Sequence, residues 1–471
     1  MFRPTTMAIA ITFALIAPAA WAQSKSELDD IRRQIKELKE TYESRIQALE
    51  KQLKNAEDAA AAAQSSATKA EAAAQAARTE SAPPVQSAQN AFNPAISLIL
   101  NGTYGNFTQD PTQYGITGFQ PPGATSPGDR GFSLGESEFF VTANVDHLFM
   151  GALNVAFESD NTVAVEEAYF QTLALGHGLT LKGGRFLSAI GYQNSIHAHA
   201  WDFVDTSLVQ RAFLGDNYSE DGIQVNWIAP LPVFVEVGSE LAAGRSLVGN
   251  FVDGELAPND RNKNGIGAGT AYLHVGDDVG VSNSYRVGVS YLRTTTGANV
   301  FPLTDTDTLT GVPNTFTNAR IQLYGADFVW KWAPEGNPRD RNFKFVSEWF
   351  QIRRDGDLTF DTTGIATTGG FRQRQSGWYA QGVYQFFSQW RVALRYDQLQ
   401  KGLLDAGINA GNIVPVDYTP RRYSAMLDWN PSEFSRVRLQ YNQDLSQQNL
   451  IDHEFFVQYI YSLGTHGAHK F

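Results

Sequence analysis

The residues best suited to chemistry lie in one short stretch, NSIHAHAWDFVD, at positions 194–205. His197 and His199 are two residues apart, so both imidazoles point to the same side if the segment is extended. With Asp202 they could offer three ligands to zinc or to another ion that prefers imidazole. The same residues could instead form a hydrogen-bonded loop fixed by its aromatic side chains. A third possibility is a pH-responsive segment, because histidine titrates near neutrality.

An enzyme would need a nucleophile with a base within reach. Ser195 and Ser207 lie near the two histidines in the sequence, but no catalytic motif surrounds them. We therefore predict neither an enzyme nor a cofactor. The chain has no cysteine, which excludes disulfides and thiolate metal sites.

The N-terminus predicts export from the cytoplasm. Residues 1–22 combine Arg3, an apolar run and the small-residue signal AWA before Gln23, as in a secretory signal peptide. A short membrane anchor is the alternative. The chain has 471 residues and a net charge of -12, and this acidity argues against nucleic acid as a partner.

Residues 23–82 predict a periplasmic coiled-coil stalk. Apolar residues such as Leu28, Ile31, Ile35 and Leu38 recur at steps of three and four, which favours self-association of the helix. A solvated single helix, or an alanine-rich linker in its second half, is the alternative. Prolines end the helix, and residues 83–93 form the predicted linker.

Residues 94–471 change to a period of two. In WRVALRYD (390–397) and SRVRLQYN (435–442), apolar and aromatic residues alternate with arginines and other polar residues. A soluble β-sandwich would expose small polar residues to solvent. A membrane barrel instead turns its apolar face to lipid and its charged residues to a water-filled lumen. The predicted fold class is an all-β transmembrane barrel of about 16 antiparallel strands, preceded by an α-helical coiled coil.

The connections alternate mostly between short turns and long Gly- and Pro-rich loops, as in outer-membrane barrels. Long outer loops are predicted at 187–220, 294–318 and 354–376. The predicted strands start near Ala95, Phe132, Phe149, Thr162, Leu179, Asp221, Pro232, Gly269, Ser284, Ala319, Asn342, Gly377, Trp390, Arg421, Phe434 and Asp452.

The barrel layout resembles trimeric sixteen-stranded outer-membrane porins. The segment VEEAYFQTLALGHGLTLKGGRF (165–186) is similar to a strand–turn–strand of the phosphate-selective porin group, with Lys182 and Arg185 as the matching basic residues. The stalk resembles the periplasmic stalks of some porins. The resemblance implies a homotrimer in outer-membrane lipid, with stalk contacts to peptidoglycan or other periplasmic partners. It also implies that the third outer loop, 187–220, narrows the pore.

The predicted pore has two sets of residues. The constriction set is His197, His199, Asp202, Asp205 and Arg211. The wall set has an acidic part and a basic part: Glu136, Glu138, Glu158 and Glu166, then Lys182, Arg185, Arg286, Arg391, Arg395, Arg422, Arg436 and Arg438. The two parts would either create a transverse field across the pore or pair with one another and with other residues.

The predicted function is passive diffusion of small hydrophilic or charged solutes through an outer-membrane porin. The alternatives are a zinc-related or phosphate-selective channel, and an envelope tether whose stalk is the main function. A TonB-gated transporter would need a plug domain, whereas the segment before Phe92 predicts a rod. The preference for cations or anions stays open.

Overall fold

The structure, a computed structural model, describes residues 36, 51, 54, 94–122, 126–244, 251–252, 255–256, 265–295, 299–304, 306, 311–361 and 366–464. The chain divides into two units, Met1–Ala91 and Phe92–Phe471. The predicted signal peptide and linker, and nearly all of the predicted stalk, lie outside the described residues. Within the described part, no helix is long and apolar enough to cross a membrane.

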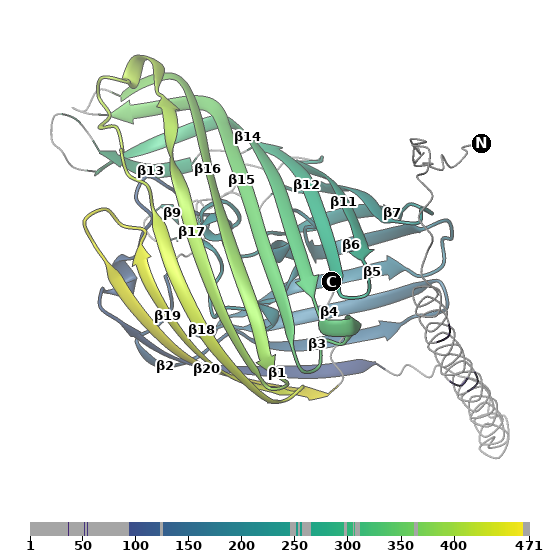
Figure 1. Cartoon of the computed structure of the whole chain (residues 1–471). Helices are drawn as coiled ribbons and strands as arrows, with labels where there is room; N and C mark the ends of the chain where they lie inside the picture. Colours follow the sequence, from purple (N-terminus) through teal and green to yellow (C-terminus); the bar gives the residue numbers. More distant parts are fainter. Residues whose placement is uncertain are drawn as a thin grey trace, which may run out of the picture. The chain divides into compact units, whose positions relative to one another are not determined.

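Sixteen strands of the described residues form one closed antiparallel barrel (Figure 1). In chain order they are β1 (Ala95–Phe107), β3 (Ser137–Asn144), β4 (Phe149–Phe157), β5 (Val163–Thr172), β6 (Leu179–Leu187), β7 (Ser219–Ile228), β8 (Phe234–Ala242), β11 (Ala268–Val279), β12 (Asn283–Thr295), β14 (Gly311–Trp332), β15 (Asn342–Asp361), β16 (Ala366–Phe387), β17 (Trp390–Asp405), β18 (Arg421–Ser432), β19 (Ser435–Leu445) and β20 (Asp452–Gly464).

The first and last strands close the ring. β1 pairs with β20 on one side, with Leu100 opposite Tyr461, and with β3 on the other, with Ile96 opposite Val141. Four short strands lie outside the ring of sixteen: β2 (Gly131–Leu134) pairs with β1, β13 (Asn299–Thr304) with β14, and β9 (Phe251–Val252) with β10 (Glu255–Leu256). The predicted barrel of about sixteen strands is confirmed.

The alternation along the strands separates an apolar outer face from a polar inner face. On β19, Leu439 and Tyr441 are exposed on the outside, whereas Arg438, Gln440 and Asn442 are buried inside. This is the two-residue period that the sequence predicts. An outer band of apolar side chains around a polar interior is the polarity of a barrel immersed in lipid.

Two of the predicted outer loops are largely strand. β12 runs to Thr295 and β14 begins at Gly311, whereas β15 runs to Asp361 and β16 begins at Ala366. The predictions of long loops at 294–318 and 354–376 are therefore wrong over most of their length. The β15–β16 hairpin stays ordered because its inner side chains pack in an apolar cluster with the next loop: Leu358, Phe360, Phe371, Ala406 and Ile413.

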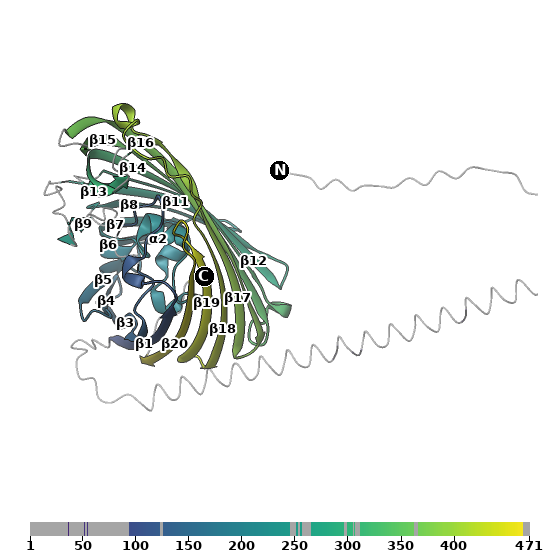
Figure 2. The same ribbon diagram turned by 90° about the vertical axis from the view of Figure 1, so that its left-hand side faces the viewer.

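The loop that joins β6 to β7 folds into the barrel. We call residues 188–218 the inner loop; it contains η2 (Gln193–Ser195), η3 (Ala198–Ala200) and α2 (Leu208–Leu214). Figure 2 shows α2 inside the curved wall of strands. Other short 3-10 helices are η1 (Pro111–Gln113), η4 (Pro334–Gly336) and η5 (Gly407–Asn409).

Local sequence sets the two ends of α2. The Ser207 side chain accepts a hydrogen bond from the Gln210 backbone N–H at 3.3 Å and caps the N-terminus. Gly215 ends the helix with a φ of 63°, in the left-handed region that glycine adopts freely. The helix packs against inner side chains of the barrel wall in one apolar cluster that includes Leu208, Val209, Phe213, Val346, Phe350 and Tyr379. The inner face of the barrel is thus apolar beneath α2.

Candidate functional site

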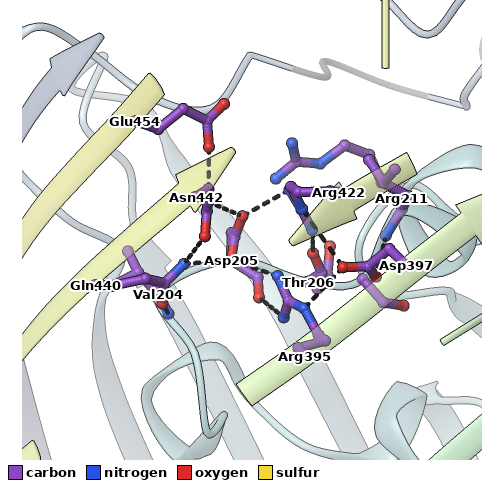
Figure 3. Close-up of polar contacts among 12 residues, drawn as sticks. Val204, Asp205, Thr206, Arg211, Arg395, Asp397, Arg422, Gln440, Asn442 and Glu454 are labelled. Carbon is purple, nitrogen blue, oxygen red and sulfur yellow. Dashed lines mark hydrogen bonds and ion pairs between the residues drawn. The ribbon is translucent and has the colours of Figure 1, made fainter. Parts of the chain in front are cut away.

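Asp205 fixes the inner loop to one wall of the barrel (Figure 3). Arg395 donates to its Oδ1 at 2.7 Å, and Arg422 Nη1 lies 2.7 Å from its Oδ2. Gln440 and Asn442 donate further hydrogen bonds at 2.8 and 3.1 Å. The same guanidinium groups also hold the loop backbone, because Arg395 donates to the Asp205 carbonyl and Arg422 to the Thr206 carbonyl.

The electrostatics of Asp205 favour its charged form. Burial alone would raise the pKa of the carboxyl group, because a low-dielectric environment disfavours charge. The charges of Arg422 and Arg395 outweigh burial and hold the pKa of Asp205 well below its usual range. The carboxylate is therefore an acid-resistant anchor for the loop.

Asp202 makes a second contact with the same wall. Its carboxylate lies 2.7 Å from Lys344 Nζ and accepts a hydrogen bond from Gln381 at 2.8 Å. These partners are on β15 and β16, away from the histidines. The predicted ligand set of His197, His199 and Asp202 is therefore wrong, because Asp202 is committed to different groups.

The two histidines face an acidic wall formed by β3 and β5. His197 Nδ1 lies 3.2 Å from Glu166 Oε2, and His197 Nε2 lies 3.0 Å from Glu167 Oε2. His199 Nδ1 lies 2.6 Å from Glu138 Oε1. Burial disfavours the imidazolium form, but these glutamates outweigh it and raise the pKa of His197 well above its usual range.

A β-bulge explains how two consecutive glutamates reach one histidine. Asn154 of β4 pairs with Glu167 and Val155 pairs with Val165, so Glu166 is the extra residue in β5. A bulge breaks the strict alternation of faces and re-aims a side chain. Glu166 and Glu167 therefore both contact His197.

Glu348 of β15 is a third anchor, which joins the start of the inner loop to α2. Its carboxylate accepts the backbone N–H of Tyr192 at 2.6 Å and the side-chain amide of Gln210 at 3.1 Å. The Tyr379 hydroxyl donates to the same group at 2.6 Å. Arg211 is buried in α2, and its Nε lies 3.5 Å from Asp216 Oδ1. Arg211 therefore stabilises the loop internally. It does not present its charge to the pore.

The predicted arginine wall is largely balanced by carboxylates. Asp428 is the centre of this pairing: it accepts from Arg391, lies 2.8 Å from Arg438 and 3.8 Å from Arg436. On β12, Arg286 lies 3.6 Å from Asp327. The wall charges were expected either to create a transverse field or to pair with other residues. On the side of the late strands, the structure favours pairing.

Arg185 does not face the lumen. It pairs in register with Asp221, its Nε lies 2.7 Å from Asp221 Oδ1, and both side chains are exposed. Asp221 is on the same outer face as Ile223 and Val225 of β7. Lys182 is buried, with its ammonium over the Tyr169 ring. The assignment of Arg185 to the pore wall is therefore wrong, because residues three apart in a strand point to opposite faces.

The remaining acidic wall residues extend the β3–β5 cluster. Glu136 directly precedes β3. Its carboxyl group is close enough to those of Glu166, Glu138 and Glu158 to interact with them electrostatically. Residues of these networks that sequence reasoning missed include Asn154, Glu167, Glu348, Asp397 and Asp428. For Asp397 a signal existed, because it lies two residues after Arg395 and therefore shares its face.

A cavity of about 600 Å³ lies beside the inner loop. Loop residues Ala189 and Ser195 line one side, and inner residues of the barrel wall line the other. Its lining carries both signs of charge, in Lys182, Arg286 and Glu236, and it also includes His274. Such a lining can accept polar solutes by hydrogen bonding without excluding either sign outright.

The fold is similar to that of solved outer-membrane proteins. OmpT, an outer membrane protein of Vibrio cholerae, is 11% identical with a TM-score of 0.49, over 81% of this chain and 100% of that one. The outer membrane channel DcaP of Acinetobacter baumannii is 10% identical with a TM-score of 0.48, over 79% and 97%. An anion-selective porin from Comamonas acidovorans is 9% identical with a TM-score of 0.48, over 79% and 99%.

Sequence comparison finds a nearer relative. No protein-family model matches the chain. A protein of Aquifex aeolicus (strain VF5), described as an uncharacterized protein, is 33% identical over 403 residues, which is 81% of each chain. At this identity and coverage, the chain belongs to the same family as the Aquifex aeolicus protein.

Proposed function

We propose that the protein is an outer-membrane porin that lets small hydrophilic or charged solutes diffuse passively. The observation that carries this proposal is the inner loop, which is fixed inside a closed barrel with an apolar outer face. A barrel with this polarity offers a polar route through lipid, and an inner loop sets the width of that route.

The inner loop sets the size limit by its attachment to opposite walls. Asp205 is fixed to β17 and β18, whereas His197 contacts glutamates of β5. A loop held against two walls keeps one position, so the channel has a defined width. The constriction residues in this proposal are His197, His199, Asp202 and Asp205, and Arg211 supports them from α2.

The charge pattern supports general polar passage over phosphate selectivity. One of the two basic residues that match the phosphate-selective group, Arg185, is on the outer face. The other, Lys182, lines a cavity together with carboxylates such as Glu236. We expect weak selectivity between anions and cations, because most arginines of the late strands are paired.

The proposal places the barrel in the outer membrane as a homotrimer, with residues 23–82 as a periplasmic stalk. The heptad pattern of that segment supports self-association. Peptidoglycan or another periplasmic component is the proposed contact of the stalk.

Liposome swelling tests the proposed function. Purified protein is incorporated into liposomes, and the rate of swelling is measured in sugars of increasing size. We expect rapid swelling with a monosaccharide and a steep fall for larger oligosaccharides. Swelling that equals that of protein-free liposomes for every sugar would contradict the proposal.

A further inference from the structure

We propose that Glu138, Glu166 and His197 bind a divalent transition-metal ion, with Zn²⁺ as the probe of choice, where the inner loop meets the barrel wall. This site differs from the sequence-based ligand set, because its oxygen ligands come from β3 and β5 and not from Asp202. It adds a binding activity to passive diffusion and does not depend on the channel being open.

The ligand atoms converge on one place. One atom from each of Glu138, Glu166 and His197 lies within 4.8 Å of the other two. Glu138 Oε2 is 3.6 Å from His197 Nδ1, and Glu166 Oε2 is 3.2 Å from it. A small movement of the three side chains would place each of these atoms about 2.0–2.2 Å from one central ion, which is the usual distance from zinc to a nitrogen or oxygen ligand.

The amide of Asn154 marks the centre of the site. Its Nδ2 lies 2.8 Å from Glu138 Oε2, 2.9 Å from Glu166 Oε2 and 3.2 Å from His197 Nδ1. The three proposed ligand atoms therefore already surround one electropositive group. A divalent ion would satisfy the same three atoms with a full positive charge.

Glu167 orients the imidazole for ligation. It lies 3.0 Å from His197 Nε2, which can donate its proton to this carboxylate. Such a bond leaves Nδ1 facing the cluster, and a carboxylate behind a metal-bound histidine fixes ring orientation and raises its basicity. A bound ion would replace the proton at Nδ1, since metal ligands bind in the deprotonated form.

Two buried oxygens around this centre have no hydrogen-bond partner among the residues that the structure describes. Asn154 is fully buried and its Oδ1 is unpaired, as is the buried Oε1 of Glu136. Buried polar atoms are rarely left unsatisfied, so each such atom calls for an explanation, and ion binding is one of them. Rotation of the Asn154 amide would turn its Oδ1 towards the same place, as a third oxygen and a fourth ligand.

The position of the site gives the ion a consequence for the loop. On the Asp205 side, arginines hold the loop to the wall, whereas on the His197 side glutamates outnumber the two histidines. Four carboxylates contact or face the histidines there: Glu136, Glu138, Glu166 and Glu167. A divalent ion would reduce this excess negative charge and link the inner loop to β3 and β5.

Zinc titration of the full-length, untagged protein tests the proposal. The protein is treated with a chelator, dialysed, and titrated by isothermal calorimetry. We expect one saturable Zn²⁺ per chain that depends on this site. In His197→Gln, Glu138→Gln and Glu166→Gln the affinity of that ion should fall by at least about tenfold.

His274→Gln is the matched control, because His274 Nδ1 lies 2.7 Å from Glu236 in another His–Glu pair of the barrel interior. It should leave the affinity unchanged. Retained heat-modifiable migration on gels verifies that each variant is folded. The proposal is overturned if the wild type binds no zinc, if His197→Gln binds like the wild type, or if His274→Gln weakens binding equally.

Discussion

At the scale of single residues, Asp205 links the inner loop to four side chains of the barrel wall. Its carboxylate and the adjoining carbonyls receive bonds from two arginines and two amides that are all buried. Removing one member of a buried ion pair leaves the other charge uncompensated, which costs about 3–5 kcal/mol.

We therefore expect Asp205→Asn to loosen the inner loop by several kcal/mol without unfolding the barrel. Protease cleavage within residues 188–218 of the folded protein should accelerate at least tenfold. Asp221→Asn is the control, because it removes a carboxylate from the exposed pair with Arg185 and should leave cleavage unchanged. Equal cleavage rates for Asp205→Asn and the wild type would show that this anchor is dispensable.

The pH dependence of the loop follows from the same carboxylate. The pKa of Asp205 is lower in the folded protein than the value of about 3.9 in an unfolded chain. Its contribution is therefore complete above that value and is lost as the pH falls towards the folded pKa. We expect loop cleavage by an acid-active protease to stay slow from about pH 6 to pH 4.5 and to rise only below about pH 4. A rise near pH 6 would contradict this assignment.

Residue-level prediction from sequence was limited by strand register and by long-range pairs. The faces of Arg391, Arg395 and Arg438 followed from alternation, whereas Arg185 was assigned to the wrong face because its separation from Lys182 was overlooked. The bulge at Glu166 could not be foreseen, since it depends on the pairing of β4 with β5. The partners of Asp202 and Asp205 lie more than 100 residues away in sequence.

At the scale of elements, α2 holds the loop by apolar packing. Phe213 and Leu208 are buried in the cluster that α2 shares with the barrel wall. The close approach of helix and wall occurs at Gly377 of β16, where an added Cβ would lie 3.1 Å from Val209 Cγ2. The helix thus packs on a surface that needs a small residue at Gly377 and large apolar residues such as Phe213 on the helix.

Phe213→Ala should weaken this docking by about 3–5 kcal/mol, because it removes a fully buried aromatic ring. Hydrogen–deuterium exchange of peptides that cover residues 205–218 measures the effect, and faster exchange is expected. Leu403→Ala, at an exposed position of β17, should leave this exchange unchanged. Protection as strong as in the wild type would mean that packing of α2 does not hold the loop.

Most strands could be predicted because alternation repeats along each of them. Predicted starts at Ala95, Phe149, Leu179, Trp390 and Arg421 coincide with the starts of strands. The starts near Ala319 and Gly377 were late, since the polar, glycine-rich residues before them pair only because a neighbouring strand extends beside them. The seven-residue α2 was missed, because its stability comes from packing in the barrel.

At the scale of the whole molecule, the closed barrel and its inner loop are one assembly. Closure satisfies the backbone groups at both ends of the sheet, which allows such a barrel to lie in lipid. The class of fold could be predicted because an apolar face opposite arginines has few other solutions. The fixed position of the inner loop could not, because it depends on contacts with strands that lie far from the loop in the sequence, such as β15, β17 and β19.

The proposed stalk leads to a separate prediction at this scale. Deletion of residues 26–79 should convert a detergent-solubilised trimer into monomers or a mixture, because it removes the apolar heptads. Light scattering of the purified complexes measures the mass. Deletion of residues 83–91, which lack the heptads, is the control. It should leave the number of chains per complex unchanged. A trimer that survives loss of residues 26–79 would show that the barrel alone supports assembly.

We propose that this barrel conducts ions and that its inner loop limits the current. Single-channel recording in planar lipid bilayers tests it with the wild type and with a variant in which residues 193–217 are replaced by a short Gly-Ser linker. We predict discrete conductance steps for the wild type and steps at least twofold larger for the variant. Closed traces for both proteins would show that the barrel does not conduct, and equal steps would show that the inner loop does not limit the current.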